Sequence, residues 1–271
     1  MRFAIVTPTL NAGGLLRETV DSVLACLGRD DRYTIVDGGS SDGSVDALRG
    51  MMPANTAIAR DHGGGMYDAI ACGFACTEGE VMGWVNASDL LLHGALEVVR
   101  RAFASTGADL VHFDDLVANE QGMIQGRTRG TIHDPAQAMR TVGWTPLQDG
   151  CFWTRALYDR IGGVDASWRV AGDFDFFLRA FHGGRACFVP GVVSAFRLHT
   201  GQLSLQRRSD YRRESTEARR RFIEAHPELR EGVLTHLRRR AALSWRARSG
   251  GASQPTPWAG RHWSTVPATL E

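Results

Sequence analysis

The sequence contains no lysine, because all 31 of its basic residues are arginine. A mechanism that needs a lysine, such as a Schiff base or the phosphate-binding lysine of a P-loop, is therefore excluded. No apolar run approaches the roughly 18 residues of a membrane-spanning helix. The first residues, MRFAIVTPTLN, also lack the charged and apolar regions of a signal peptide. We therefore expect a cytoplasmic protein.

Cysteine is scarce and carries no metal-binding or redox spacing. The five cysteines form no C-x-x-C pair, so we expect buried, reduced thiols rather than a zinc site or disulfides. Charge is unevenly spread, although the formal net charge is only +1. From Leu205 onward there are 14 Arg against 7 acidic residues, whereas the part before it holds 17 Arg against 23 acidic residues. An acidic main domain and a basic tail follow from this distribution.

Apolar runs and helical spacing alternate along the first half of the chain. Short apolar runs predict strands at 3–6, 33–36, 56–59, 81–85 and 110–113. Helical spacing predicts helices at 15–27, 45–51, 67–77 and 91–104. This alternation indicates an α/β fold with a mostly parallel central sheet flanked by helices. Ligands bind beyond the carboxyl ends of such strands, so we expect chemistry directly after Val6, Val36 and Val85.

Composition divides the chain into four segments. Residues 1–115 predict the ligand-binding half of one domain, and 116–205 a second half with shorter elements and many aromatics. Arg-rich helices are predicted at 209–225 and 228–248, within a basic extension over 206–248. Residues 249–271 are rich in turn-forming residues, which predicts a disordered tail.

Polar clusters follow the predicted strands at the expected edge. The first, TPTLN, presents a Pro-containing turn and the side chain of Asn11. The second, DGGSSDGS, begins with Asp37, whose carboxylate can accept a hydrogen bond from a nucleotide base or ribose, and its glycines permit close backbone approach. For Asp42, capping of the following helix is the better interpretation.

These clusters resemble the N-terminal half of family 2 glycosyltransferases, which have a GT-A fold. The segments IVTPTLNAGGLLRETVDSVL and TIVDGGSSDGSVDAL carry the resemblance, together with GMYDA at 65–69. It implies that the nucleotide of a UDP-type sugar donor is bound by these residues: Thr7, Pro8, Thr9, Asn11, Asp37, Gly38, Asp61, Asn86 and Ser88. The segments QDGCFW at 148–153 and GGVD at 162–165 also resemble the family, where they floor the acceptor site. For Phe152, Trp153 and Trp168, stacking on a sugar and burial in the core both remain open.

The segment WVNASDL at 84–90 occupies the place of the family's metal-binding signature. The usual metal-binding Asp is Ser88 here, and the following Asp is Asp89. The resemblance implies that Asp89, with His199, holds Mn²⁺ or Mg²⁺ against the donor diphosphate. The segment FRLHTGQLS at 196–204 further places Arg197 and His199 near the diphosphate, although a structural role for His199 is equally open.

The segment AGDFDFFLR at 171–179 resembles the family motif that carries the general base. Asp173 matches that base, and an N-cap role for the same residue is compatible with it. Asp175 and Arg179 are one helical turn apart, so we interpret them as a structural ion pair.

The resemblance implies transfer of a sugar from a nucleotide-diphospho-sugar to an acceptor hydroxyl with inversion, in bacterial surface polysaccharide or lipid-linked glycan assembly. A nucleotidyltransferase is disfavoured, because no Gly-rich phosphate loop with basic residues is present. A catalytically degenerate, nucleotide-binding relative is the alternative, because of Ser88. We expect a glycan or lipid-linked acceptor and no nucleic acid partner. The basic extension is a solvated face by default, and a contact with the inner membrane surface is the second interpretation.

Overall fold

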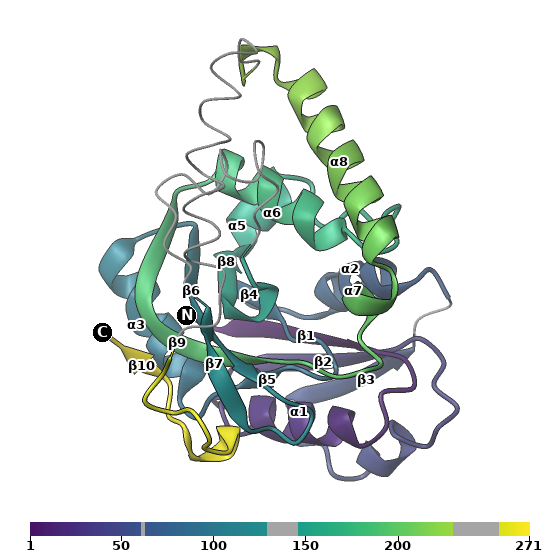
Figure 1. Cartoon of the computed structure of the whole chain (residues 1–271), viewed down its shortest axis with the longest axis vertical. Coiled ribbons are helices and arrows are strands. Elements are labelled where there is room, and N and C mark those ends of the chain that lie inside the picture. Colours follow the sequence, from purple (N-terminus) through teal and green to yellow (C-terminus); the bar gives the residue numbers. More distant parts are fainter. Residues whose placement is uncertain (61–62, 129–145, 230–254) are drawn as a thin grey trace.

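A single mixed sheet forms the centre of the protein (Figure 1). The computed structural model describes residues 1–60, 63–128, 146–229 and 255–271. Ten strands pair in the order β10-β9-β6-β8-β4-β1-β2-β3, with β5 joined to β9 and β7 joined to β6. The strands are β1 (Phe3–Thr9), β2 (Arg32–Asp37), β3 (Thr56–Arg60), β4 (Val81–Trp84), β5 (Leu90–Leu91), β6 (Leu110–Ala118), β7 (Ile124–Thr128), β8 (Cys151–Thr154), β9 (Ala186–Arg197) and β10 (Thr269–Leu270).

The two halves of the sheet differ in strand direction. Strands β3, β2, β1 and β4 are all parallel to their neighbours, as the alternating pattern predicts. In the other half, β6 and β9 are parallel to each other. Strand β8 is antiparallel to β4 and β6, β7 is antiparallel to β6, and both β5 and β10 are antiparallel to β9. The predicted boundary between residues 115 and 116 falls inside β6, so the two predicted halves of the domain share one sheet.

Helices cover both faces of the sheet. One face packs against α2 (Met66–Cys76), α5 (Arg155–Arg160), α6 (Gly172–Gly183) and α8 (Arg208–Ala225), and the other against α1 (Gly14–Leu24) and α3 (Ala95–Thr106). Side chains of a strand alternate between faces, so Val6 of β1 faces α2 and Ile5 faces α1. Gly73 permits the close approach of α2, because a Cβ there would lie 2.6 Å from Val6.

Aromatic side chains fill the core between α6 and the sheet. Trp153 of β8 is fully buried, and its ring centroid lies 4.7 Å from that of Phe176 and 5.2 Å from that of Trp84. Phe152 is also fully buried, and Trp168 is nearly so. These rings are therefore core residues rather than sugar-stacking surfaces.

Several local predictions need correction. Residues 45–51 form only a 3-10 turn, Asp46–Leu48, instead of a helix. Residues 255–271 are not disordered: they contain a 3-10 turn, Trp263–Thr265, and strand β10, which pairs with β9. Val266 of this tail is fully buried against the edge of the sheet. Cys72 and Cys76 are exposed on α2, contrary to the expectation of buried thiols, although all five cysteines are free.

The basic extension is described only in part. Helix α8 matches the predicted helix 209–225, and it follows a short helix, α7 (Leu203–Gln206). Residues Pro227–Leu229 form a 3-10 turn, and the rest of the predicted helix 228–248 lies outside the described residues. Among the helices that the structure describes, none is long and apolar enough to cross a membrane.

Candidate functional site

Two adjoining cavities lie beyond the carboxyl ends of β1, β2 and β4. The Gly38 cavity, of about 480 Å³, includes strand-end residues Pro8, Thr9 and Gly38. The Asp173 cavity, of about 300 Å³, is lined by Asn86, Ser88, Asp89, Gln148, Asp149, Asp173 and His199 among others. Both cavities include Met66, Gly201 and Leu203, so they meet at one wall. The parallel half of the sheet therefore presents a continuous hollow at the edge that the sequence predicts.

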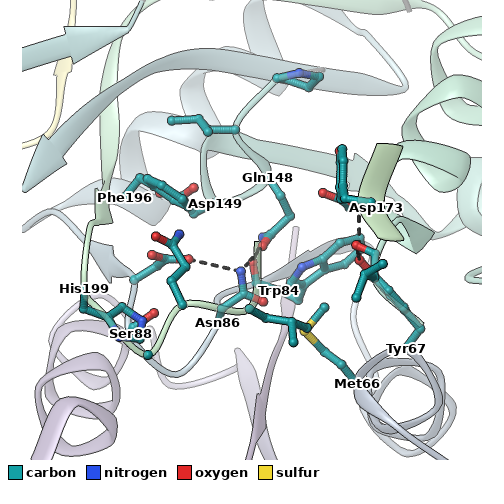
Figure 2. A pocket seen from close by; sticks show the side chains of 18 residues that line it. Met66, Tyr67, Trp84, Asn86, Ser88, Gln148, Asp149, Asp173, Phe196 and His199 are labelled. Carbon is teal, nitrogen blue, oxygen red and sulfur yellow. Dashed lines mark hydrogen bonds between the residues drawn. The ribbon is translucent and has the colours of Figure 1, made fainter. Parts of the chain in front are cut away.

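Asp173 lies in the first turn of α6 and faces the Asp173 cavity (Figure 2). The helix is capped by Ala171, so the side chain of Asp173 is not its N-cap. Its Oδ1 accepts hydrogen bonds from the backbone N–H of Phe174 at 2.7 Å and from the hydroxyl of Tyr67 at 3.2 Å. Burial raises the pKa of Asp173 to about 6. The carboxylate is therefore ionised at neutral pH and basic enough to accept a proton.

Helix α8 holds the segment that leads into Asp173. Glu214 of α8 accepts hydrogen bonds at Oε2 from three consecutive backbone N–H groups, those of Arg169 (3.1 Å), Val170 (2.9 Å) and Ala171 (3.1 Å). The hydroxyl of Tyr67 also lies 3.1 Å from the carbonyl oxygen of Val170. Sequence reasoning missed Tyr67 and Glu214, because each is far from Asp173 along the chain. Tyr67 stands in the GMYDA motif, which is the one signal that could have pointed to it.

Asn86 and Asp89 form a hydrogen-bonded group directly after β4. Asn86 donates from Nδ2 to Oδ2 of Asp89 at 3.1 Å. It also donates to Oε1 of Gln148 at 2.9 Å (Figure 2). The Oδ1 of Asp89 accepts a hydrogen bond from the backbone N–H of Arg197 at 3.1 Å. Gln148 in turn donates to the carbonyl oxygen of Trp84. This group ties the loop after β4 to the end of β9 beneath the cavity.

Three buried carboxyl groups cluster beneath the Asp173 cavity. Burial raises the pKa of Asp89 to about 6. Burial and repulsion from neighbouring carboxylates raise the pKa of Asp149 and of Asp115 well above the usual range. Ser194 donates a hydrogen bond to Oδ1 of Asp115 at 2.7 Å. The floor of the cavity is therefore less negatively charged than its carboxyl count suggests.

The predicted nucleotide-binding loops contact each other. Asn11 accepts at Oδ1 a hydrogen bond from the backbone N–H of Ser41 at 2.8 Å, which joins the turn after β1 to the loop after β2. Asp42 accepts a hydrogen bond from the backbone N–H of Gly13 at 2.8 Å and so adds a second tie between the loops. It also accepts two hydrogen bonds from Ser44, but the 3-10 turn that follows begins after Val45 and has no side-chain cap, so the predicted capping role of Asp42 is wrong. Asn11 and Asp42 therefore shape these loops.

Two other predicted donor residues also make local contacts. Asp37 accepts at Oδ1 from the backbone N–H groups of Gly39 (3.1 Å) and Ser40 (2.8 Å). Thr7 is fully buried and accepts a hydrogen bond from the hydroxyl of Tyr33 at 2.8 Å. Neither side chain lines the two cavities, whereas their neighbours Pro8, Thr9 and Gly38 do.

The residues predicted to contact the diphosphate are separated by the structure. His199 lines the Asp173 cavity, and burial lowers its pKa, so the imidazole is neutral at neutral pH. Arg197 is fully buried, and its guanidinium pairs with Glu18 at 2.8 Å and donates to the carbonyl oxygen of Glu120 at 3.0 Å. It lines neither cavity and points away from the predicted diphosphate position. Asp61 lies outside the described residues.

Comparison with known proteins gives the family. Residues 4–160 match the profile described as Glycosyl transferase family 2. The chain belongs to glycosyl transferase family 2. A relative in this family, the PGL/p-HBAD biosynthesis glycosyltransferase of Mycobacterium bovis, is 28% identical over 187 residues, which cover 66% of this chain and 69% of that protein.

Solved structures show the same fold. Residues 1–349 of TarS from S. aureus, solved with UDP, match with a TM-score of 0.64 and 15% identity, over 92% of this chain and 72% of that one. In another TarS structure the match spans only 37% of the solved chain. The mannosyltransferase PcManGT from Pyrobaculum calidifontis, solved with GDP-Man and Mn²⁺, matches with a TM-score of 0.57 and 17% identity, over 93% of this chain and 76% of that one. The predicted GT-A-like fold is therefore confirmed.

The described residues of this family 2 member show no preformed cluster of metal ligands, and metal binding by Asp89 and His199 stays a prediction. Ser88 has no charge to offer, and both carboxylate oxygens of Asp89 already accept hydrogen bonds from the protein. Asp89 is only 2% exposed. Within the described ranges, no three His, Cys, Asp or Glu side chains gather closely enough to hold a metal ion. Asp89 supports the loop after β4 through these hydrogen bonds, and we derive no catalytic step from a metal.

Proposed function

We propose that this family 2 member is an inverting glycosyltransferase that uses a nucleotide-diphospho-sugar donor. The position of Asp173 carries the proposal. Its carboxyl group lines a cavity that adjoins the Gly38 cavity, where the strand-end loops resemble the nucleotide-binding loops of the family. Hydrogen bonds from Tyr67 and from the start of α6 orient this carboxylate. Its pKa of about 6 suits a base that works near neutral pH.

The proposed reaction is a single displacement at the anomeric carbon. The acceptor hydroxyl attacks that carbon while its proton moves to the carboxylate of Asp173. The bond from the anomeric carbon to the diphosphate oxygen breaks, and its electron pair stays on that oxygen. Attack opposite the leaving group inverts the configuration, and the nucleoside diphosphate departs with one more negative charge than it carried in the donor.

The relatives support a nucleotide-sugar donor and suggest a class of acceptor. TarS was solved with UDP and UDP-GlcNAc, and PcManGT with GDP-Man, which supports a nucleotide-sugar donor. We propose a UDP-type donor, in line with the resemblance of the loops after β1 and β2 to the nucleotide-binding loops of the family. The mycobacterial relative's name assigns it to PGL/p-HBAD biosynthesis. We therefore propose a glycan or lipid-linked acceptor of bacterial surface assembly.

Replacement of the proposed base tests this function. Asp173→Asn keeps the size of the side chain but cannot accept the proton, so we expect the turnover rate to fall about 10²- to 10⁴-fold. Binding of UDP by calorimetry should change little. Asp159→Asn, at an exposed position on α5, is the matched control and should retain wild-type turnover. A turnover rate in Asp173→Asn equal to that of the wild type would refute the assignment.

A binding-only relative is the second candidate function, and Ser88 favours it. Position 88 has a hydroxyl in place of the usual carboxylate, and the described residues contain no cluster of three metal ligands. A catalytically degenerate relative would bind nucleotide and show no turnover. Assay of the wild type against a panel of UDP-, GDP- and dTDP-sugars, each with and without Mn²⁺ or Mg²⁺, separates the two functions. Use of either cation by this chain stays a prediction.

Membrane contact through the basic extension also stays a prediction, as does a cytoplasmic location. Arginines of α8 are paired with carboxylates of the same helix: Glu217 contacts Arg220 at 2.7 Å and Arg221 at 2.8 Å, and Asp210 contacts Arg213 at 2.6 Å. Such pairing leaves less charge for anionic lipid. The described part of the extension therefore favours a solvated face.

A further inference from the structure

The Asp173 cavity offers no cationic side chain to a departing diphosphate. Asp89, Asp149 and Asp173 all line it, and its described lining contains no arginine. Lysine is absent from the sequence altogether. His199 is the one basic side chain in this lining, and burial lowers its pKa so that it is neutral at neutral pH. The positive charge that the proposed reaction needs must therefore come from the neighbouring cavity or from a bound cation.

Two arginines line the Gly38 cavity, next to the wall that both cavities share. Arg169 precedes Asp173 by four residues, and Arg207 follows α7. The Nη1 of Arg169 lies 3.6 Å from the position that a Cβ on Gly65 would take. Gly65 stands directly before α2 and has a φ of 103°, which favours glycine. The guanidinium of Arg169 therefore lies across from the start of α2, within the hollow that the strand-end loops border.

Arg169 is anchored by its backbone while its guanidinium is available. Its N–H donates to Glu214, which fixes the main chain at this point. Within the residues that the structure describes, its guanidinium has no hydrogen-bond or ion-pair partner, whereas the guanidinium of Arg207 pairs with Asp210 at 3.1 Å. An arginine fork can donate two parallel hydrogen bonds to a phosphate. The guanidinium of Arg169 is thus free to bind an anionic ligand in this hollow.

We propose that Arg169 binds the diphosphate of the donor, with Arg207 beside it, and stabilises the negative charge of the departing nucleoside diphosphate. This inference rests on the proposed function and specifies how that site handles the leaving group. It assigns to arginine the charge compensation that a metal ion held beside Ser88 and Asp89 would otherwise supply. Because arginine is always protonated, this contribution does not vary with pH below about 12.

The test measures nucleotide binding by calorimetry in the presence of EDTA. Wild type, Arg169→Gln, Arg169→Lys and the control Arg101→Gln are compared with uridine, UMP and UDP, and with GDP and dTDP. Arg101 is an exposed arginine of α3, on the opposite face of the sheet. Circular dichroism and the Tm of each variant verify that it is folded.

We expect Arg169→Gln to weaken UDP binding about 10- to 100-fold, as the loss of a charge-assisted hydrogen bond predicts. Uridine binding should not change, Arg169→Lys should recover part of the loss, and Arg101→Gln should bind UDP as the wild type does. Equal UDP affinity in wild type and Arg169→Gln overturns the inference, as does wild-type binding that requires Mn²⁺. If the wild type binds UDP and turns over but Arg169→Gln is unaffected, only this inference fails. If the wild type binds none of the nucleotides, the proposed function fails with it.

Discussion

Replacing Tyr67 with Phe probes the proposed base through the pH dependence of the reaction. The Tyr67 hydroxyl contacts Oδ1 of Asp173 at 3.2 Å, and this hydrogen bond lowers the pKa of the carboxyl group against the larger effect of burial. Tyr67→Phe removes the bond and leaves the aromatic ring, which is buried in the core. The pKa of Asp173 should therefore rise above its wild-type value of about 6.

The size of the shift follows from the strength of the lost bond. A hydrogen bond to a charged group contributes about 1.5 to 3 kcal/mol, and one pKa unit corresponds to about 1.4 kcal/mol, so the shift is about 1 to 2 units. With a shift of about 1 unit, the ionised fraction of Asp173 at pH 5.5 falls about eightfold, whereas at pH 8.5 it barely changes. The acidic limb of kcat/KM should therefore move from near pH 6 to near pH 7.

The assay is kcat/KM against pH for wild type, Tyr67→Phe and Tyr33→Phe. Tyr33 is a matched control, because it is also a buried tyrosine and donates a hydrogen bond to Thr7 at 2.8 Å. Its replacement should leave the acidic limb in place. An unmoved limb in Tyr67→Phe, or the same loss at every pH, would show that Tyr67 is structural and does not act on the base.

Three further predictions concern stability. Burial raises the pKa of Asp173 from 3.8 to about 6, so its ionised form destabilises the fold above pH 6, and this cost disappears below pH 4. In urea titrations, Asp173→Asn should therefore increase the free energy of unfolding by about 2 to 3 kcal/mol at pH 8 and leave it unchanged at pH 3.5. Glu214→Ala should lower that free energy by about 2 to 4 kcal/mol and reduce turnover, while Glu214→Gln, which keeps an acceptor oxygen, should lose less in both assays. Val266→Ala should cost about 2 kcal/mol of unfolding free energy because it removes a buried side chain at the sheet edge, and an unchanged urea midpoint would contradict the packing of this tail.

Local sequence patterns predict the parallel half of the sheet well. Strands β1, β2 and β4 are apolar runs that are buried on both faces, so their pattern and their structure coincide. Strand β6 is longer than the predicted 110–113, because Asp114 and Asp115 interrupt the apolar run although both are buried in the sheet. Pairing supplied by distant strands overrides the local pattern there.

Tertiary contacts also explain the other differences. Residues 255–271 have the composition of a disordered tail, but β9 offers an edge to which β10 pairs, and no local pattern shows this. Within the site, the resemblance to the family names Asn86, Asp173 and His199, and the structure shows that all three line one cavity. The contact of Tyr67 with Asp173 joins residues 106 positions apart, so only the fold reveals it.

The contacts of Glu214 make helix α8 part of the mechanical support of the base. Three backbone N–H groups just before α6 depend on this one carboxylate, which comes from a helix outside the segment that matches the family profile. Fraying of α8 on heating would release these groups while the parallel half of the sheet is still intact. Heat inactivation of transfer should therefore precede unfolding of the sheet, and it should reverse on cooling as long as the sheet has not unfolded.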